Sequence, residues 1–289
     1  MLRPDLYTAK HTQWFYFRVQ NTLAGNAVYL LTITSPGGTA GKRVVVASAR
    51  AHPGESGGSW AMRGFLDFLL SAHADARLLR RLFVFKVVPM LNPDGVVVGN
   101  SRCSLAGRDP NRAYGMALPG SFPTSRMGPL LWQCWWPYPD TCRMLAEQEV
   151  VLYCDFHGHS RKNNVFMYGC DAGGDDAGTR LRQRVFPLML SKNAPDKFSF
   201  SSCKFQVQKS KERTGRVSMW RLGVSHSYTL EVAFSGSTLG EGLPQPQGQC
   251  QGGGPGLESC PCFLFLVLSR WEEFPLQRGG SGVTGPPPL

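Results

Sequence analysis

Two short segments of the chain carry residue types that catalytic metal ions prefer. His52 and Glu55 enclose a Pro-Gly pair, and His157 follows much later, two residues after Asp155. A histidine and a glutamate three apart on one turn can reach a single ion, and a distant histidine can complete the set. Three nitrogen or oxygen ligands, with the fourth position left to water, form the ligand set of catalytic zinc. The sequence therefore predicts a zinc site built from His52, Glu55 and His157.

Each segment directly follows an apolar, β-branched stretch, at residues 44–48 and 150–154. Ligand sites in α/β sheets gather at the carboxyl ends of strands, which favours a common site. The alternative is that these histidines are surface side chains beside a turn, since histidine is often only a hydrogen-bonding group. A structural zinc site would more often use cysteine, but the nine cysteines include no CxxC pair. The pattern favours a catalytic metal.

The apolar pattern along the chain predicts alternating strands and helices. Apolar residues at helical spacing predict a helix over residues 60–70, with Ser59 as a candidate N-cap. Continuous apolar or β-branched runs predict buried strands at residues 28–34, 44–48, 82–88 and 150–155. This alternation indicates an α/β sandwich with a mixed, mostly parallel central sheet.

The composition favours a globular protein with acidic partners. Hydrophobic residues make up 42% of the chain and the formal net charge is +11. Such a charge points to nucleic acid, anionic lipid or an acidic peptide, although a solvated basic face is the plain alternative. No RNA-binding aromatic signature accompanies the charge, so nucleic acid is the weaker choice. Basic residues concentrate shortly before Glu231, namely Lys204, Lys209, Lys211, Arg213, Arg216 and Arg221.

Several classes of protein are not expected. The polar opening of the chain lacks a signal peptide, and the nine cysteines without compact spacing favour reduced thiols in a cytosolic protein. The apolar run at residues 263–268 is too short to span a bilayer. The glycine-rich residues 37–43 differ from a phosphate loop at two positions and lead into a strand, which argues against nucleotide binding.

Five segments of the chain resemble the cytosolic carboxypeptidases, a branch of the M14 zinc metallocarboxypeptidases that trims glutamates from tubulin. These segments are residues 50–55, 85–95, 100–107, 154–164 and 227–231. Residues 186–198 are most similar to cytosolic carboxypeptidases 2 and 3. The resemblance covers roughly residues 40–240 and implies the carboxypeptidase fold, a three-layer sandwich around a mixed sheet.

The resemblance also implies roles for further residues. Glu231 matches the family's catalytic glutamate, which takes a proton from water and later delivers it to the departing amine. Arg102 matches the arginine that polarises the scissile carbonyl. Asn111 and Arg112 match the pair that grips the substrate's terminal carboxylate, a task that suits the planar guanidinium. The family has Leu where this chain has Pro110, which fixes its own φ and lacks a donor, so we expect a displaced clamp.

Three regions are expected along the chain. Residues 1–22 resemble the opening of a β-rich domain that precedes the catalytic domain in this family, whereas residues 22–26 already resemble its end, so most of that domain is expected to be missing. Residues 23–240 form the expected catalytic domain. Residues 241–289 form a Gly/Pro-rich tail that departs from the family and has a composition that rarely folds by itself.

The leading hypothesis is a zinc carboxypeptidase, with Zn²⁺ as cofactor, that removes C-terminal or side-chain glutamates from polyglutamylated proteins. The resemblance implies tubulin as substrate and a cytoplasmic location, with the cytoskeleton, centriole and cilium basal body as family sites. We expect a monomer without nucleic-acid or membrane partners. The alternative is a catalytically impaired fragment that binds acidic tails. The complete set of site residues favours the enzyme, while Pro110 and the missing domain favour the fragment.

Overall fold

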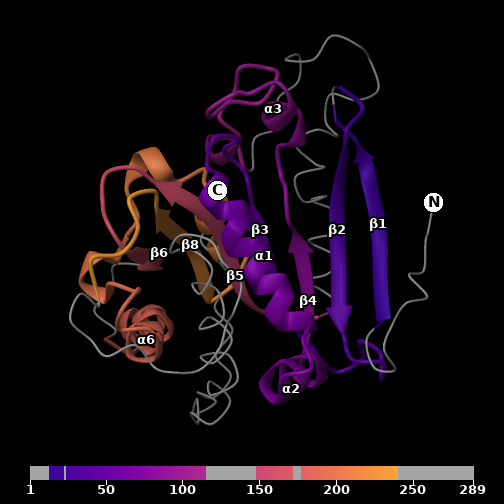
Figure 1. Cartoon of the computed structure of the whole chain (residues 1–289). Coiled ribbons are helices and arrows are strands. Elements are labelled where there is room, and N and C mark those ends of the chain that lie inside the picture. The colour runs from indigo at the N-terminus through magenta and orange to yellow at the C-terminus, as the bar shows by residue number, and fades with distance from the viewer. Residues whose placement is uncertain (1–12, 23, 115–147, 172–176, 240–289) are drawn as a thin grey trace.

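The computed structural model describes residues 13–22, 24–114, 148–171 and 177–239 (Figure 1). The expected tail at residues 241–289 therefore lies outside the described residues. Within them, one sheet holds eight strands: β1 (Gln13–Asn21), β2 (Ala27–Thr34), β3 (Arg43–Ala49), β4 (Phe83–Val88), β5 (Val150–His159), β6 (Val165–Asp171), β7 (Lys204–Gln206) and β8 (His226–Ala233).

The described helices connect and cover these strands. They are α1 (Ser56–Leu70), α2 (Ala74–Leu82), α3 (Pro93–Val97), α6 (Ala177–Asn193) and α7 (Gly215–Arg221), with short 3₁₀ turns η1 (Pro110–Arg112), η2 (Phe200–Ser202) and η3 (Lys209–Lys211). No helix in the described ranges is both long enough and apolar enough to cross a bilayer.

The sheet has the order β1-β2-β4-β3-β5-β8-β6-β7. Its centre, β4-β3-β5-β8, is parallel, and so is the edge pair β6-β7. The β1-β2, β2-β4 and β6-β8 pairs are antiparallel. The sheet is therefore mixed and mostly parallel, as predicted. Residues 13–21, which the sequence placed in the remnant of a preceding domain, extend this same sheet as β1.

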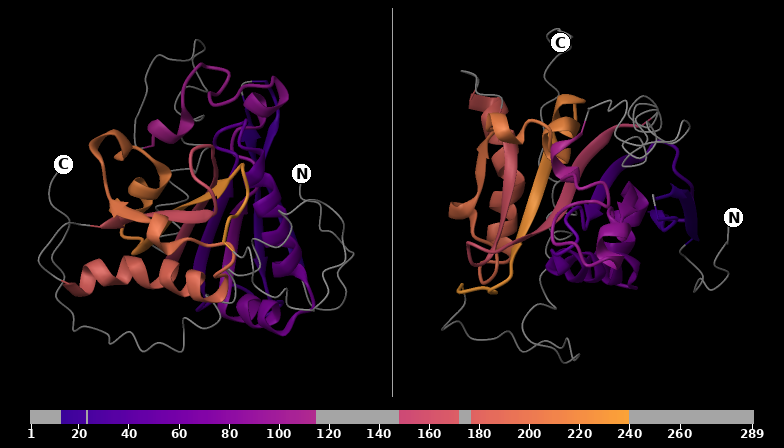
Figure 2. Two further views of the ribbon diagram at one scale, coloured as in Figure 1. Left: turned by 60° about the vertical axis from the view of Figure 1, so that its left-hand side comes forward. Right: turned by 90° about the horizontal axis from the view of Figure 1, so that it is seen from above.

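The central strands are buried on both faces, which explains their continuous apolar runs. On β3, Val45 and Ala47 pack into the large core with side chains of α1, α2 and α6, whereas Val44 and Val46 pack on the other face with Met219 of α7. Helices thus cover both faces, and the expected three-layer sandwich is confirmed. Figure 1 shows α1 crossing in front of the central strands, and Figure 2 shows the twist of the sheet.

Helix α1 is fixed on the sheet by aromatic contacts. Phe65 is fully buried and packs edge-on against Phe85 of β4 and Phe156 of β5, with ring centroids 6.3 and 5.7 Å apart. Gly58 permits close approach, because a Cβ there would lie 3.0 Å from the Phe156 carbonyl oxygen. These contacts hold the first turn of α1 at the carboxyl ends of β3 and β5, next to His157.

The start of α1 differs from the sequence prediction. The helix begins at Ser56 with Glu55 as its N-cap, whereas Ser59, the expected cap, lies inside the first turn. The apolar periodicity starts only after two glycines, Gly57 and Gly58, which pack as buried residues against the sheet. Because glycine carries no apolar side chain, the pattern concealed the first turn.

Candidate metal centre and active site

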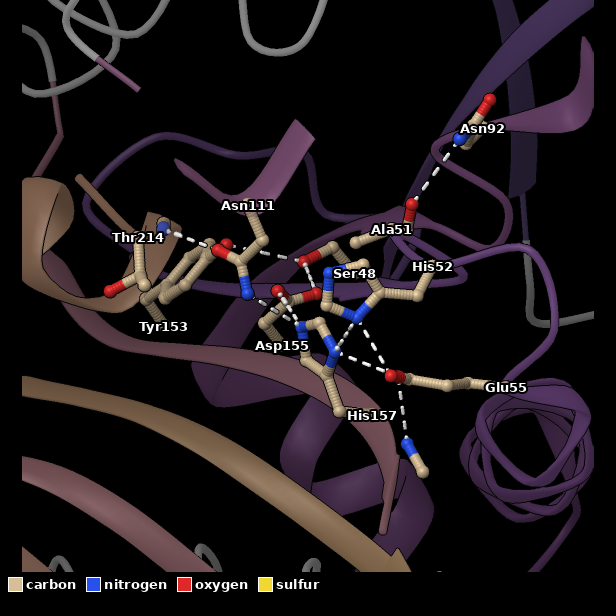
Figure 3. A network of polar contacts seen from close by, with 12 residues as sticks. Ser48, Ala51, His52, Glu55, Asn92, Asn111, Tyr153, Asp155, His157 and Thr214 are labelled. Atoms are coloured by element: carbon tan, nitrogen blue, oxygen red, sulfur yellow. Dashed lines mark hydrogen bonds and ion pairs between the residues drawn. The ribbon is translucent and has the colours of Figure 1, made fainter. Parts of the chain in front are cut away.

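Three side chains converge where β3 and β5 end (Figure 3). His52 lies in the turn after β3, Glu55 caps α1, and His157 lies near the end of β5. Glu55 Oε1 lies 2.7 Å from His52 Nδ1, and Glu55 Oε2 lies 2.8 Å from His157 Nδ1. The three ligand atoms lie within 4.8 Å of one another, as a common metal ion requires. The structure thus brings the predicted triad together.

The hydrogen bonds of the two histidines fit a cation between them. His52 Nε2 lies 2.9 Å from Asp109 Oδ1, and His157 Nε2 lies 2.6 Å from Asp155 Oδ2. An ionised carboxylate only accepts, so each Nε2 carries the proton, and in a neutral ring Nδ1 then presents a lone pair. The two Nδ1 atoms are 3.1 Å apart and both face Glu55. Acceptors this close favour a shared cation, and two nitrogens plus one carboxylate suit zinc.

The charges around the triad lead to the same conclusion. Burial opposes protonation of His157, yet the carboxylates of Asp155 and Glu55 raise its pKa well above the ordinary value. Burial raises the pKa of Glu55, but the hydrogen bonds and positive charges that His157 and His52 supply in their protonated form outweigh it and hold that pKa far below the usual range. A positive charge is therefore favoured beside these carboxylates. Zinc held by His52, Glu55 and His157 would supply Lewis acidity and would make nearby water a better nucleophile at neutral pH.

Each carboxylate behind the histidines has its own support. Asp155 is almost fully buried, and its Oδ1 accepts a hydrogen bond of 2.8 Å from Ser48 Oγ on β3. Asp109 accepts from Arg102 Nε at 2.8 Å, and Arg102 Nη2 lies 2.7 Å from the same oxygen. The sequence analysis did not identify Asp109. A histidine that binds a metal usually has a carboxylate partner, and this requirement could have pointed to Asp109, two residues before Asn111.

Glu231 lies on β8 beside the metal ligands. Its Cα pairs in parallel register with that of His157, so both side chains project from the same face of the sheet. The pKa of Glu231 is raised to about 7, chiefly by burial; the charges of His157 and His52 lower it, and those of Glu55 and Asp155 raise it. A carboxylate in this position can exchange a proton with a water molecule in the cavity. The structure thus places Glu231 beside the triad and in the wall of the same cavity, and its part in proton transfer stays a prediction.

The 3₁₀ turn η1 carries the two residues expected to bind the substrate carboxylate. Pro110 occupies its first position, where no backbone donor is needed, and Asp109 caps the turn. Arg112 lines the cavity next to the triad. Asn111 is buried, with its Oδ1 3.0 Å from the Gly215 amide and its Nδ2 3.1 Å from His157 Nε2. The amide of Asn111 therefore faces the protein, and its substrate contact stays a prediction.

A cavity of about 720 Å³ joins these groups and is strongly basic. Among the described residues, its cationic lining consists of Arg102, Arg112, Arg161, Lys204, Lys211 and Arg216. Of the basic cluster that the sequence analysis noted, Lys209, Arg213 and Arg221 are not part of this lining. Glu55 and Glu231 are its acidic members, so the wall carries a clear excess of positive charge.

Arg216 has a special place in this wall that the sequence did not reveal. It lies in the first turn of α7, is 5% exposed, and donates from Nη1 to the Gly169 carbonyl at 2.5 Å. Its guanidinium lies over the Tyr168 ring, 5.6 Å from the centroid, and its buried Nε has no hydrogen-bond partner among the described residues. A buried guanidinium with an unpaired Nε donor, in the wall of a cavity, is suited to receive an anion.

Gly54 gives a first testable consequence of this architecture. A Cβ at this position would lie 2.8 Å from the Ser101 carbonyl oxygen, to which the Gly54 amide donates. We expect Gly54→Ala to destabilise the fold by about 1–3 kcal/mol, because backbone atoms cannot easily move away. Zinc affinity should fall as well, since the turn that carries Glu55 must shift.

Thermal unfolding and zinc titration measure both effects. Gly37→Ala is the matched control, because a Cβ at Gly37 meets no atom within 4 Å. If the Gly54 and Gly37 variants behave alike, the close packing against Ser101 has no energetic importance.

Comparison with known proteins agrees with this site. Residues 6–250 match the family model of the M14 peptidases, the zinc carboxypeptidases. The chain is 62% identical to cytosolic carboxypeptidase 2 of Danio rerio over 224 residues, which is 76% of this chain and 30% of that protein. It is 56% identical to cytosolic carboxypeptidase 3 of Bos taurus over 223 residues, 76% of this chain and 21% of that protein. The chain belongs to the M14 zinc carboxypeptidase family.

Solved structures support the fold. A metallo-carboxypeptidase from Burkholderia cenocepacia matches with a TM-score of 0.70 at 22% identity, covering 90% of this chain and 65% of that one. A metallo-carboxypeptidase from Pseudomonas aeruginosa matches with a TM-score of 0.65 at 21% identity, covering 88% and 63%. The chain spans less than a third of the length of the curated relatives named above.

Proposed function

We propose that this chain is a zinc-dependent carboxypeptidase that removes glutamates from acidic protein tails, with polyglutamylated tubulin as a substrate. The observation that carries the proposal is the shared cavity, in which the His52, Glu55 and His157 triad, Glu231 and six cationic side chains meet. The relatives at 62% and 56% identity are named cytosolic carboxypeptidases, which supports action in the cytosol. Sites at the cytoskeleton, centriole or cilium, and a monomeric state, are part of the proposal.

The positive wall supports an acidic substrate. Lys204 and Lys211 line the cavity, and their charges attract a polyanionic tail over several ångströms. Arg216 acts at shorter range, because its buried guanidinium has a free donor and little access to water. We propose that Arg216 receives the side-chain carboxylate of the glutamate that is released. Arg112 holds its terminal carboxylate through paired hydrogen bonds.

The proton chemistry rests on Glu231. Its carboxylate accepts the proton of the attacking water and then delivers that proton to the departing amine, so that the group returns to its starting state. Arg102 steadies the oxyanion that develops on the scissile carbonyl. For that contact the guanidinium must turn towards the substrate while its partner Asp109 continues to hold His52.

The test uses glutamate peptides of several lengths, with free or amidated ends, at low and high ionic strength. Added salt should first erode the preference for long chains, because it screens exposed charges such as Lys204. The requirement for a free carboxylate should persist, since short-range bonds to Arg112 are less affected by salt. Equal cleavage of amidated peptides would refute the exopeptidase proposal. A length preference that ignores salt would show that the basic wall is only a solvated surface.

A second candidate is a catalytically impaired fragment that binds acidic tails. The observation in its favour is that both Arg102 and Asn111 are engaged by protein groups, the first by the Asp109 carboxylate and the second by the Gly215 amide. Binding of a polyglutamate peptide to the zinc-loaded protein without release of glutamate would support this candidate. Release that depends on zinc would exclude it.

A further inference from the structure

Arg50 stands at the start of the turn that carries two of the metal ligands. It is the first residue after β3 and lies two residues before His52. Its φ is 58°, and among the described residues only Arg50 and Asn164 combine a positive φ with a side chain other than glycine. A non-glycine residue pays a conformational cost in this region, so the position is held by its surroundings.

The guanidinium of Arg50 spans the turn at residues 50–55, here called the ligand turn because it carries His52 and Glu55. Its Nη2 donates to the Pro53 carbonyl at 2.7 Å, and its Nη1 donates to Ser59 Oγ at 2.7 Å. Pro53 lies between His52 and Glu55, and Ser59 lies in the first turn of α1. The two bonds therefore tie the end of β3 to the middle of the turn and to the helix that follows.

The ligand turn lacks a common constraint, because the side chain at the N-cap position of α1 does not cap the helix. Glu55 occupies the N-cap position of α1, yet its side chain makes no capping hydrogen bond. The carboxylate is directed to His52, His157 and the Gly158 amide instead. The start of α1 therefore lacks a side-chain cap and is held by backbone bonds, in which the Ser56 and Gly58 amides donate to the Gly54 and Glu55 carbonyls. The bonds from Arg50 replace the missing constraint on this segment.

The backbone of Arg50 is anchored too. Its carbonyl accepts from the Asn92 amide at 3.1 Å, and the preceding Ala49 carbonyl accepts from the Leu91 amide at 2.9 Å. Asn92 Nδ2 approaches the Ala51 carbonyl, as Figure 3 shows. Arg50 is thus held through its backbone by the loop after β4, and through its side chain by the ligand turn and α1.

We infer that Arg50 is a positioning residue for zinc, which sets the distance between His52 and Glu55 by holding the ligand turn against α1. Arg50 is absent from the described lining of the cavity, so it acts through the ligands and not on the substrate. The inference concerns the metal site alone and is independent of which peptide the protein cleaves.

The experiment measures zinc affinity by competition with a chelator and, separately, the unfolding temperature of the metal-free protein. We expect Arg50→Ala to weaken zinc binding about tenfold, the scale seen when groups that orient metal ligands are lost. Arg50→Lys should recover only part of the affinity, because one ammonium cannot reproduce a planar fork with two fixed directions. Ser59→Ala removes one of the two bonds and should cause a smaller loss.

Arg50→Gly separates the side chain from the backbone. Glycine adopts a positive φ without strain, so this variant should unfold at a higher temperature than Arg50→Ala. Its zinc affinity should nevertheless be as low as that of the alanine variant, because the guanidinium is absent in both. Wild-type zinc affinity in Arg50→Gly would overturn the inference.

Arg80 provides the matched control. It is buried and its Nη1 donates to the Leu69 and Ser71 carbonyls, at the opposite end of the same helix α1. Arg80→Ala should lower the unfolding temperature and leave zinc affinity unchanged. If the Arg80 and Arg50 variants lose zinc affinity in the same proportion to their loss of stability, Arg50 has only a general structural role. A changed visible spectrum of the cobalt-substituted protein in Arg50→Lys, but not in Arg80→Ala, would be a direct sign of altered ligand geometry.

Discussion

Glu231→Gln is expected to lower the rate of glutamate release by about 10²–10⁴-fold, the usual cost of losing a positioned proton-transfer group. Glutamine has nearly the same shape as glutamate, so zinc content and peptide affinity should stay close to those of the parent protein. The side chain lies beside His157 on the neighbouring strand and has no part in the ligand triad. The loss should therefore appear in turnover and not in metal binding.

Glu212→Gln is a suitable control for this variant. Glu212 is a partly exposed glutamate that pairs with Arg221, 3.5 Å away, and it does not line the described cavity. Its replacement should leave turnover unchanged. Near-normal release of glutamate by the Glu231 variant would remove this residue from the proton chemistry. Loss of zinc from the same variant would show that it supports the metal site instead.

The metal ligands could be predicted from the sequence because their signal is local. His52 and Glu55 are separated by a spacing that one turn accommodates, and apolar runs before them and before His157 predicted strand ends. The resemblance to a known family added Glu231 and Arg102, whose positions no periodic pattern reveals. The parallel register of β5 and β8 explains the position of Glu231, because it places that residue beside His157.

The partners of these residues could not be predicted in the same way. Asp109 reaches His52, and Ser48 reaches Asp155, only because separate loops and strands meet in space, and neither residue has a distinctive sequence pattern of its own. Arg216 was noted as one member of a basic cluster, but its burial depends on how α7 packs over β6. The start of α1 was placed too late for a related reason, because the close approach of Gly58 to β5 is a tertiary feature.

The ligand turn illustrates the limit of local pattern most clearly. Ser59 has the residue type of a helix cap, and its hydroxyl does take part in fixing the start of α1. It does so as an acceptor for Arg50, four residues after the observed cap position, which belongs to the metal ligand Glu55. A functional demand thus displaced the usual capping arrangement, and such places are where sequence rules are expected to fail.

His157→Ala should remove most of the zinc, which we expect at about one ion per chain in the parent protein. Two remaining ligands bind an ion only weakly, so occupancy after dialysis should fall sharply. His157 is also the buried partner of Asp155, which is 1% exposed. The variant leaves a buried carboxylate without its partner, at a cost of about 3–5 kcal/mol in stability.

Because this second effect could unfold the protein, the decisive comparison adds Asp155→Asn to His157→Ala. The neutral amide can keep a hydrogen bond with Ser48 and carries no unpaired charge, so stability should return while zinc stays lost. His159→Ala is the matched control, since His159 Nδ1 accepts from the Arg161 and Lys162 amides and is outside the triad. Zinc content measured by atomic emission should be normal in that control. Normal zinc content in the folded double variant would exclude His157 as a ligand and, with it, the site proposed at the ends of β3 and β5.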